Sequence, residues 1–157
     1  MVDEFKRKFD SFEIHFYYNK CKKFYLGIYG QTDDYYRCYL ILEVREVWQM
    51  WHILKKCPDF ESIEMHEKVF VMNNLYYKKN QGMEGEQIVL YRAFYDGERV
   101  KKDLRECIVI EKHIYKVFWE GLQYFSEKPY VKQNTPHFHQ GQLEFLQCPE
   151  CHDLPRW

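Results

Sequence analysis

Residues 12–44 read FEIHFYYNKCKKFYLGIYGQTDDYYRCYLILEV, and apolar and polar side chains alternate through much of this stretch. Alternation with a period of two is typical of strands that bury one face. Polar segments at residues 19–22 and 30–34 divide the stretch, and their Asn, Gly and Asp residues are typical of turns. We therefore predict an antiparallel meander of three strands, at residues 12–18, 23–29 and 35–44.

Two other segments have helical spacing. Val47, Met50, Trp51 and Leu54 would share one side of a helix that begins near residue 45 and ends before Pro58. Residues 112–126 form the clearest helix, because their apolar side chains recur every three or four residues. We also expect a short helix at residues 2–10, where Val2, Phe5 and Phe9 would lie on one face.

The remaining pattern indicates further strands, separated by a polar loop at residues 78–86 and a turn at Asp96-Gly97. We place these strands at residues 68–77 and 87–95, at a short return strand ending near Val100, and at residues 107–110. The fold class is therefore α+β: a mostly antiparallel sheet of about five to seven strands packed by two main helices. We expect a single domain, with a core at residues 1–127 and an irregular, proline-containing C-terminal tail at 128–157 that belongs to it.

The overall composition argues against several broad classes of protein. The chain has 157 residues, with a net charge of −1, and a general binder of nucleic acid or membrane surfaces usually carries a large positive excess. The first residues are charged and lack the apolar core of a signal peptide, so we expect a cytoplasmic protein with no membrane association. In that compartment the six cysteines are expected to be free thiols or metal ligands.

The C-terminal tail contains a cluster of metal-ligand residue types. Cys148 and Cys151 form a Cys-x-x-Cys pair, and His137 and His139 precede it. Two cysteines and two histidines can complete a tetrahedral zinc site, and four protein ligands leave no open position for catalysis. The cluster therefore suggests a structural zinc ion, and the alternative is that these residues are exposed in a flexible tail.

Aromatic residues make up 19% of the chain, and the predicted meander collects several tyrosines on one side. Tyr17, Tyr25, Tyr29 and Tyr39 would lie on the face opposite the buried one, mixed with charged residues. Tyrosine combines a rigid apolar ring with a polar tip, which suits protein interfaces. We therefore take these four residues as the candidate partner-binding residues, unless the helix at 112–126 covers them.

We find no nucleophile motif, P-loop or dinucleotide fingerprint, and therefore assign no catalytic residue and favour a non-enzymatic role. The leading hypothesis is a protein-binding module that inhibits or neutralises a partner, as immunity proteins and phage anti-defence inhibitors do. One alternative is a small zinc-dependent enzyme or nuclease. Another is a binder of single-stranded nucleic acid, because basic and aromatic residues mix at 20–25 and 76–79. The oligomeric state is left open.

Overall fold

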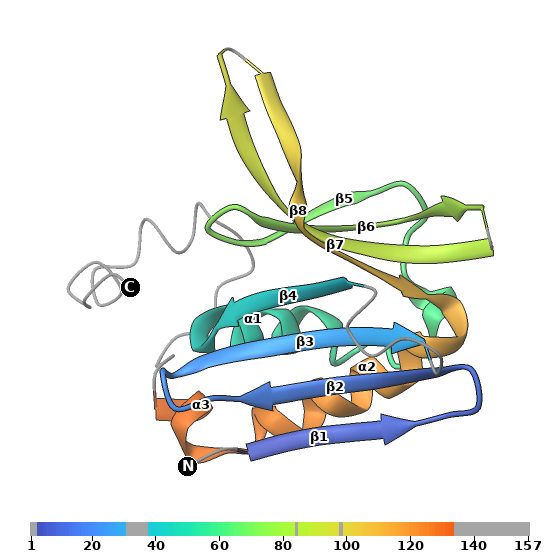
Figure 1. The fold of residues 1–157 in the computed structure, drawn as a ribbon. Helices are drawn as coiled ribbons and strands as arrows, with labels where there is room; N and C mark the ends of the chain where they lie inside the picture. Colours follow the sequence, from blue (N-terminus) through green and yellow to red (C-terminus); the bar gives the residue numbers. More distant parts are fainter. Residues whose placement is uncertain (1–2, 31–37, 84, 98, 134–157) are drawn as a thin grey trace.

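The computed structural model describes residues 3–30, 38–83, 85–97 and 99–133. Four strands and a helix come first along the chain, and four more strands and two helices follow (Figure 1). The elements are β1 (Asp3–Lys8), β2 (Phe12–Tyr18), β3 (Lys23–Gly30), β4 (Cys38–Glu43), α1 (Val44–Leu54), the short 3-10 helix η1 (Phe60–Ser62), β5 (Lys68–Met72), β6 (Leu75–Gly82), β7 (Gly85–Asp96), β8 (Arg99–Glu111), α2 (Lys112–Ser126) and α3 (Pro129–Gln133).

The strands form two antiparallel sheets, each with its strands in sequence order. We name them sheet A (β1–β4) and sheet B (β5–β8). The last strand of each sheet lies beside the other, because β4 is in contact with β8. The α+β class is thus confirmed, but there are eight strands in two sheets instead of five to seven in one.

The single strand predicted at 68–77 is wrong, because β5 and the start of β6 form a hairpin there with a turn at Asn73-Asn74. Three further predictions were wrong because polar residues pair in strands. Residues 3–8 form β1, not a helix, and pair with β2 from Asp3↔Tyr18 to Lys8↔Glu13. Its many charged side chains suit an exposed sheet edge, whereas a helix of this length has little stability of its own. The predicted loop at 78–86 is mostly strand, since β6 runs to Gly82 and pairs with β7. The strands near Val100 and at 107–110 are one continuous β8.

The helices cover one face of sheet A (Figure 1). Phe16 and Leu26 on this face are fully buried, as are Phe118 and Phe125 of α2, within one hydrophobic core. Gly121 of α2 allows the closest approach, because a Cβ there would lie 3.1 Å from ring carbons of both Phe5 and Phe16. The apolar spacing that predicted α1 and α2 therefore corresponds to the sides that face the core.

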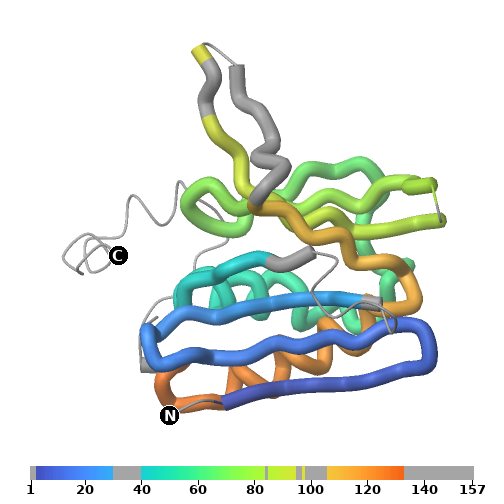
Figure 2. Tube along the Cα trace, viewed as in Figure 1, coloured from blue at the N-terminus to red at the C-terminus, as the bar shows by residue number. Residues whose placement is uncertain are grey.

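The ends of the helices are tied to distant segments. Tyr115 and Trp119 of α2 donate hydrogen bonds to the carbonyl oxygens of Cys57 and Leu54, at 2.5 and 2.9 Å, and so satisfy acceptors at the end of α1. The end of α2 and α3 lie beside the N-terminal strand (Figure 2). Within the described residues, no helix is both long enough and apolar enough to cross a membrane.

Candidate interaction surface

The outer face of sheet A, opposite the helices, carries three of the predicted tyrosines, Tyr17, Tyr25 and Tyr29. Strand pairing places Tyr17 of β2 directly across from Tyr25 of β3, and Tyr25 across from Ile41 of β4. The next register position holds His15 across from Gly27. We call this surface, made by His15, Tyr17, Tyr25, Tyr29 and Ile41 with its charged neighbours, the tyrosine face.

The rings at the centre of the tyrosine face are stacked and ordered. The Tyr17 and Tyr25 ring centroids are 5.2 Å apart with planes inclined by only 10°, and His15 stacks on Tyr17 at 4.7 Å. Burial, followed by the neighbouring Tyr25, raises the pKa of the Tyr17 hydroxyl. The hydroxyl therefore stays protonated at neutral pH and can donate a hydrogen bond to a partner.

Paired charges surround these rings. Lys6 Nζ lies 3.1 Å from Glu13 Oε1, and Lys23 Nζ lies 3.1 Å from Glu43 Oε1. His15 Nε2 lies 2.7 Å from Glu4 Oε2. Each of these three carboxylates thus has a basic neighbour. The described part of the face therefore lacks a large patch of either positive or negative charge.

Glu13, one of the charged residues around the stacked rings, is engaged by two neighbouring side chains. Its burial alone would raise the carboxyl pKa, but a hydrogen bond from Tyr29 and the cation of Lys6 outweigh that effect and lower the pKa. Glu13 is therefore ionised at neutral pH and accepts a hydrogen bond from the neutral Tyr29 hydroxyl.

The predicted site residues fall into two groups. The structure brings Tyr17 and Tyr25 into contact, and Tyr29 lies on the same face, across from Glu13. Tyr39 pairs with Gly27 through its backbone, but its side chain lies outside the described residues. The proposed zinc ligands His137, His139, Cys148 and Cys151 also lie outside them. Among the residues that the structure does describe, no group of three metal-ligating side chains converges.

A second aromatic surface lies on sheet B, and the sequence pointed only to its segment at 76–79. The segment Tyr76-Tyr77-Lys78-Lys79 is split by the strand: Tyr77 and Lys79 face the core, whereas Tyr76 and Lys78 face away from it. Lys79 is buried and donates to the carbonyl oxygens of Phe60 and Ile63 at 3.0 and 3.1 Å. The alternation was visible in the sequence, but the partners of Tyr76 on β5 and β7 depend on strand register.

A polar cavity of about 410 Å³ lies at the junction of the two sheets, and Arg92 is one of the residues that line it. The Arg92 guanidinium donates to both carboxylate oxygens of Glu46 at 2.6 Å and to the carbonyl oxygen of Ile41 at 3.0 Å. Glu46 Oε1 also accepts from the backbone N–H of Glu43 at 2.9 Å. These groups join β7 to β4 and α1. The polar residues that line the cavity are therefore explained by their role in holding the two sheets together. Its lining residues are Lys23, Ile41, Glu43, Glu46, Asn73, Asn74, Arg92 and Glu106.

No protein-family model matches the sequence, and no curated protein is significantly similar to it.

Proposed function

We propose that the protein is a non-enzymatic binding module that holds a protein partner against the tyrosine face of sheet A and blocks or neutralises it. The observation that carries this proposal is the arrangement of the face, with stacked rings at its centre and paired charges around them. Protein interfaces have the same anatomy: aromatic residues concentrate in the centre, and a polar rim excludes water from them.

The charge on the tyrosine face favours a protein over a nucleic acid. Among the residues that the structure describes, three lysines and three glutamates point to this side of sheet A, so the formal charges of these six cancel. The phosphate backbone of a nucleic acid would gain little electrostatic binding energy on such a surface. A protein with its own mixed charges can instead extend the existing ion pairs at the rim. The six residues are Lys6, Lys8, Lys23, Glu4, Glu13 and Glu43.

A neutralising role requires only that the bound partner be occluded. Ring stacking and the hydrogen bond to Glu13 restrain these side chains before a partner binds, so we expect binding to cost little additional side-chain entropy. Inhibitors and immunity proteins work in this way, by covering a surface of the partner without chemistry. The proposal needs no catalytic group on this chain.

Site-specific photo-crosslinking tests the proposal. A benzophenone amino acid in place of Tyr25, in the full chain expressed in its native cells, should form an adduct with one protein in stoichiometric amount. The adduct should survive nuclease treatment and should disappear when Tyr17→Ala is added. Purified partner should then bind the unmodified chain and lose activity on binding.

The matched control places the same crosslinker at Tyr76 on sheet B. The proposal is wrong if positions 25 and 76 capture the same proteins, because the capture would then be non-specific. It is also wrong if no stoichiometric protein is captured at position 25 while thermal unfolding shows an intact fold.

A further inference from the structure

The outer face of sheet B carries a row of aromatic rings across three neighbouring strands. Phe70 of β5 lies across from Tyr76 of β6, which lies across from Tyr91 of β7. The ring centroids of Phe70 and Tyr76 are 5.2 Å apart, and those of Tyr76 and Tyr91 are 5.9 Å apart. Phe70 and Tyr76 are partly exposed, and Tyr91 is buried beneath its neighbours. None of the three belongs to the main hydrophobic cluster between the sheets and the helices.

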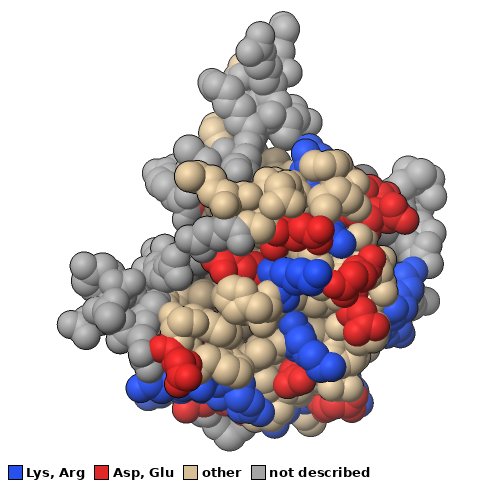
Figure 3. All heavy atoms as spheres, turned by 90° about the vertical axis from the view of Figure 1, so that its right-hand side faces the viewer, with Lys and Arg blue, Asp and Glu red and all other residues tan. Residues whose placement is uncertain are grey.

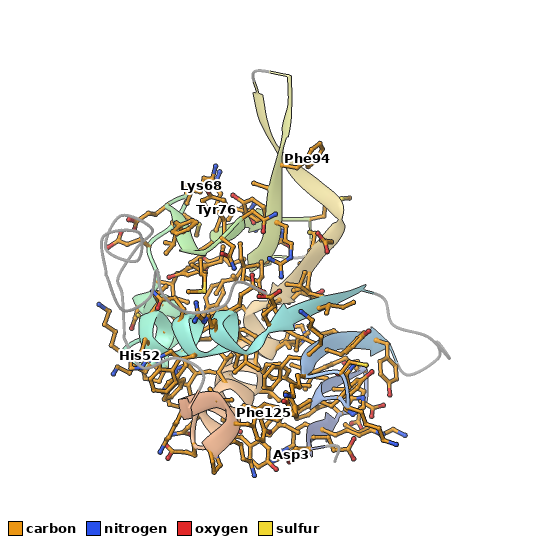
Figure 4. The ribbon with its side chains drawn as sticks, turned by 90° about the vertical axis from the view of Figure 1, so that its left-hand side faces the viewer. Asp3, His52, Lys68, Tyr76, Phe94 and Phe125 are labelled. Atoms are coloured by element: carbon orange, nitrogen blue, oxygen red, sulfur yellow. The ribbon has the colours of Figure 1, made fainter. Side chains whose placement is uncertain are left out.

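Two lysines flank this row on the same face. Lys68 lies directly across from Lys78 in the β5–β6 pair, and Lys68 Nζ sits 4.6 Å from the centre of the Tyr76 ring. Figure 4 shows Lys68 and Tyr76 side by side, at the opposite end of the molecule from Asp3 and Phe125. Like charges directly opposite each other destabilise a strand pair.

These lysines differ from those of the tyrosine face in their partners. Lys6 and Lys23 each have a carboxylate within 3.1 Å. No carboxylate among the described residues lies within ion-pair distance of Lys68 or Lys78. The sheet B face therefore presents an uncompensated positive pair beside accessible rings. On the face that Figure 3 shows, acidic and basic side chains are intermixed.

We propose that the outer face of sheet B binds a short segment of single-stranded nucleic acid. Unpaired bases would stack on Phe70 and Tyr76, and Lys68 and Lys78 would neutralise the phosphates on either side. Stacking on aromatic rings accepts any base and requires that the base be unpaired, which excludes an intact duplex. This site is separate from the tyrosine face and does not depend on the proposed protein partner.

Fluorescence anisotropy of the full chain with labelled dT and rU oligonucleotides of about 12 nucleotides tests the proposal. With two phosphates neutralised, log K should fall with log salt concentration with a slope of about −1.4. A duplex of the same length should bind more weakly. The proposal is overturned if neither single strand binds saturably below about 100 µM at low salt, or if the duplex binds as tightly.

Variants separate stacking from charge. Tyr76→Ala should weaken binding about tenfold, whereas Tyr76→Phe should retain it because the ring remains. Lys78→Gln should reduce the salt slope by about 0.7. Tyr25→Ala and Lys23→Gln on the tyrosine face are the matched controls and should leave binding unchanged. Equal losses in the control variants would overturn the proposal.

Amide chemical shifts of the wild-type chain give a test that needs no substitution and so does not depend on how well Tyr76→Ala folds. Addition of the oligonucleotide should shift amides in β5, β6 and β7 near Phe70, Tyr76 and Tyr91. Shifts confined to sheet A would assign the binding to another surface and overturn the proposal. Capture of a protein instead of nucleic acid by a crosslinker at position 76 would overturn it as well.

Discussion

Arg92 joins sheet B to sheet A through a nearly buried ion pair with Glu46, whose side chain is only 1% exposed. Arg92→Leu would leave this carboxylate without its cation, so we expect the free energy of unfolding to fall by about 3–5 kcal/mol. Urea denaturation measures the change. Glu46→Gln added to Arg92→Leu should recover part of it, because a neutral amide needs no counter-charge. A loss below about 1 kcal/mol would mean that the pair behaves like an exposed one.

His52 is the residue whose protonation should destabilise the fold in mild acid. Burial, and then the nearby cation of Lys55, lowers its pKa to about 4. Unfolded histidine titrates near 6.5, so the stability due to neutral His52 is fully present above about pH 6.5 and is lost as the pH falls towards 4. NMR titration of the imidazole should give the depressed pKa. The Trp48 ring, 4.1 Å away, should change its fluorescence over the same range, and His52→Phe should remove that change.

Zinc binding by His137, His139, Cys148 and Cys151 in the C-terminal tail remains a prediction from the sequence. Native mass spectrometry of the full chain should detect one zinc ion per molecule, and Cys148→Ser should abolish it because a tetrahedral site would lose a ligand. Cys21→Ser is the matched control, since Cys21 is exposed in the turn between β2 and β3. Metal-free protein from a zinc-supplemented preparation would contradict the hypothesis.

Among the elements, β1 is attached to α2 and α3 by polar contacts to one carboxylate, that of Asp3, and by the packing of Phe5 against α2. Tyr124 and Tyr130 donate to the two Asp3 oxygens at 2.6 and 2.9 Å, and Lys128 Nζ lies 3.2 Å away. Asp3→Ala removes these acceptors, so we expect a loss of about 1–3 kcal/mol. Hydrogen exchange should accelerate in β1 and α3 before the rest.

Glu4→Gln serves as the control for Asp3→Ala, because Glu4 is on the same strand but its side chain is 56% exposed. We expect a change within about 0.5 kcal/mol for this variant. Equal exchange rates in β1 for the wild type and Asp3→Ala would show that packing of Phe5 alone holds the strand. The attachment should also weaken below pH 4, since the Tyr124 and Tyr130 hydrogen bonds outweigh burial and lower the pKa of Asp3.

The elements that the sequence predicted well are those whose apolar period reflects burial. The helices α1 and α2 and the strands β2 and β3 have core-facing residues such as Met50, Phe118, Phe16 and Leu26 at the expected spacing. The same alternation predicted that Tyr17 and Tyr25 would share a face. Strand β1 and the end of β6 were missed because their stability comes from backbone pairing with neighbours, which composition does not reveal. The Phe70–Tyr76–Tyr91 row was missed for a similar reason, since register brings its rings together.

At the scale of the whole molecule, four antiparallel strands followed by a helix occur twice, although the sequence contains no recognisable repeat. The two halves nevertheless share one core. Phe118, Leu122 and Phe125 from the second half pack with the core of sheet A, and Val131 of α3 is fully buried. The two halves thus have the same order of strands and helix, but this similarity does not mean that each half folds by itself.

We therefore predict that a fragment of residues 1–63 does not fold alone. Its sheet would expose the apolar side that α2 and α3 normally cover, and the end of α1 would lack Tyr115 and Trp119. Circular dichroism during urea titration should show no cooperative transition for this fragment. Adding residues 64–133 should restore one if the halves associate. A cooperative transition in the fragment alone would show that sheet A and α1 form a self-sufficient unit.

The late position of α2 also has a consequence for biosynthesis. Translation proceeds from Glu43 to Phe125 in roughly 4–16 s at about 5–20 residues per second. Until α2 has been made, the apolar face of β2 and β3 at Phe16, Phe24 and Leu26 lacks part of the helical layer that buries it in the folded chain. The strands of sheet A are therefore synthesised several seconds before the helix α2 that covers them. We expect the nascent chain to need chaperone protection most during this interval.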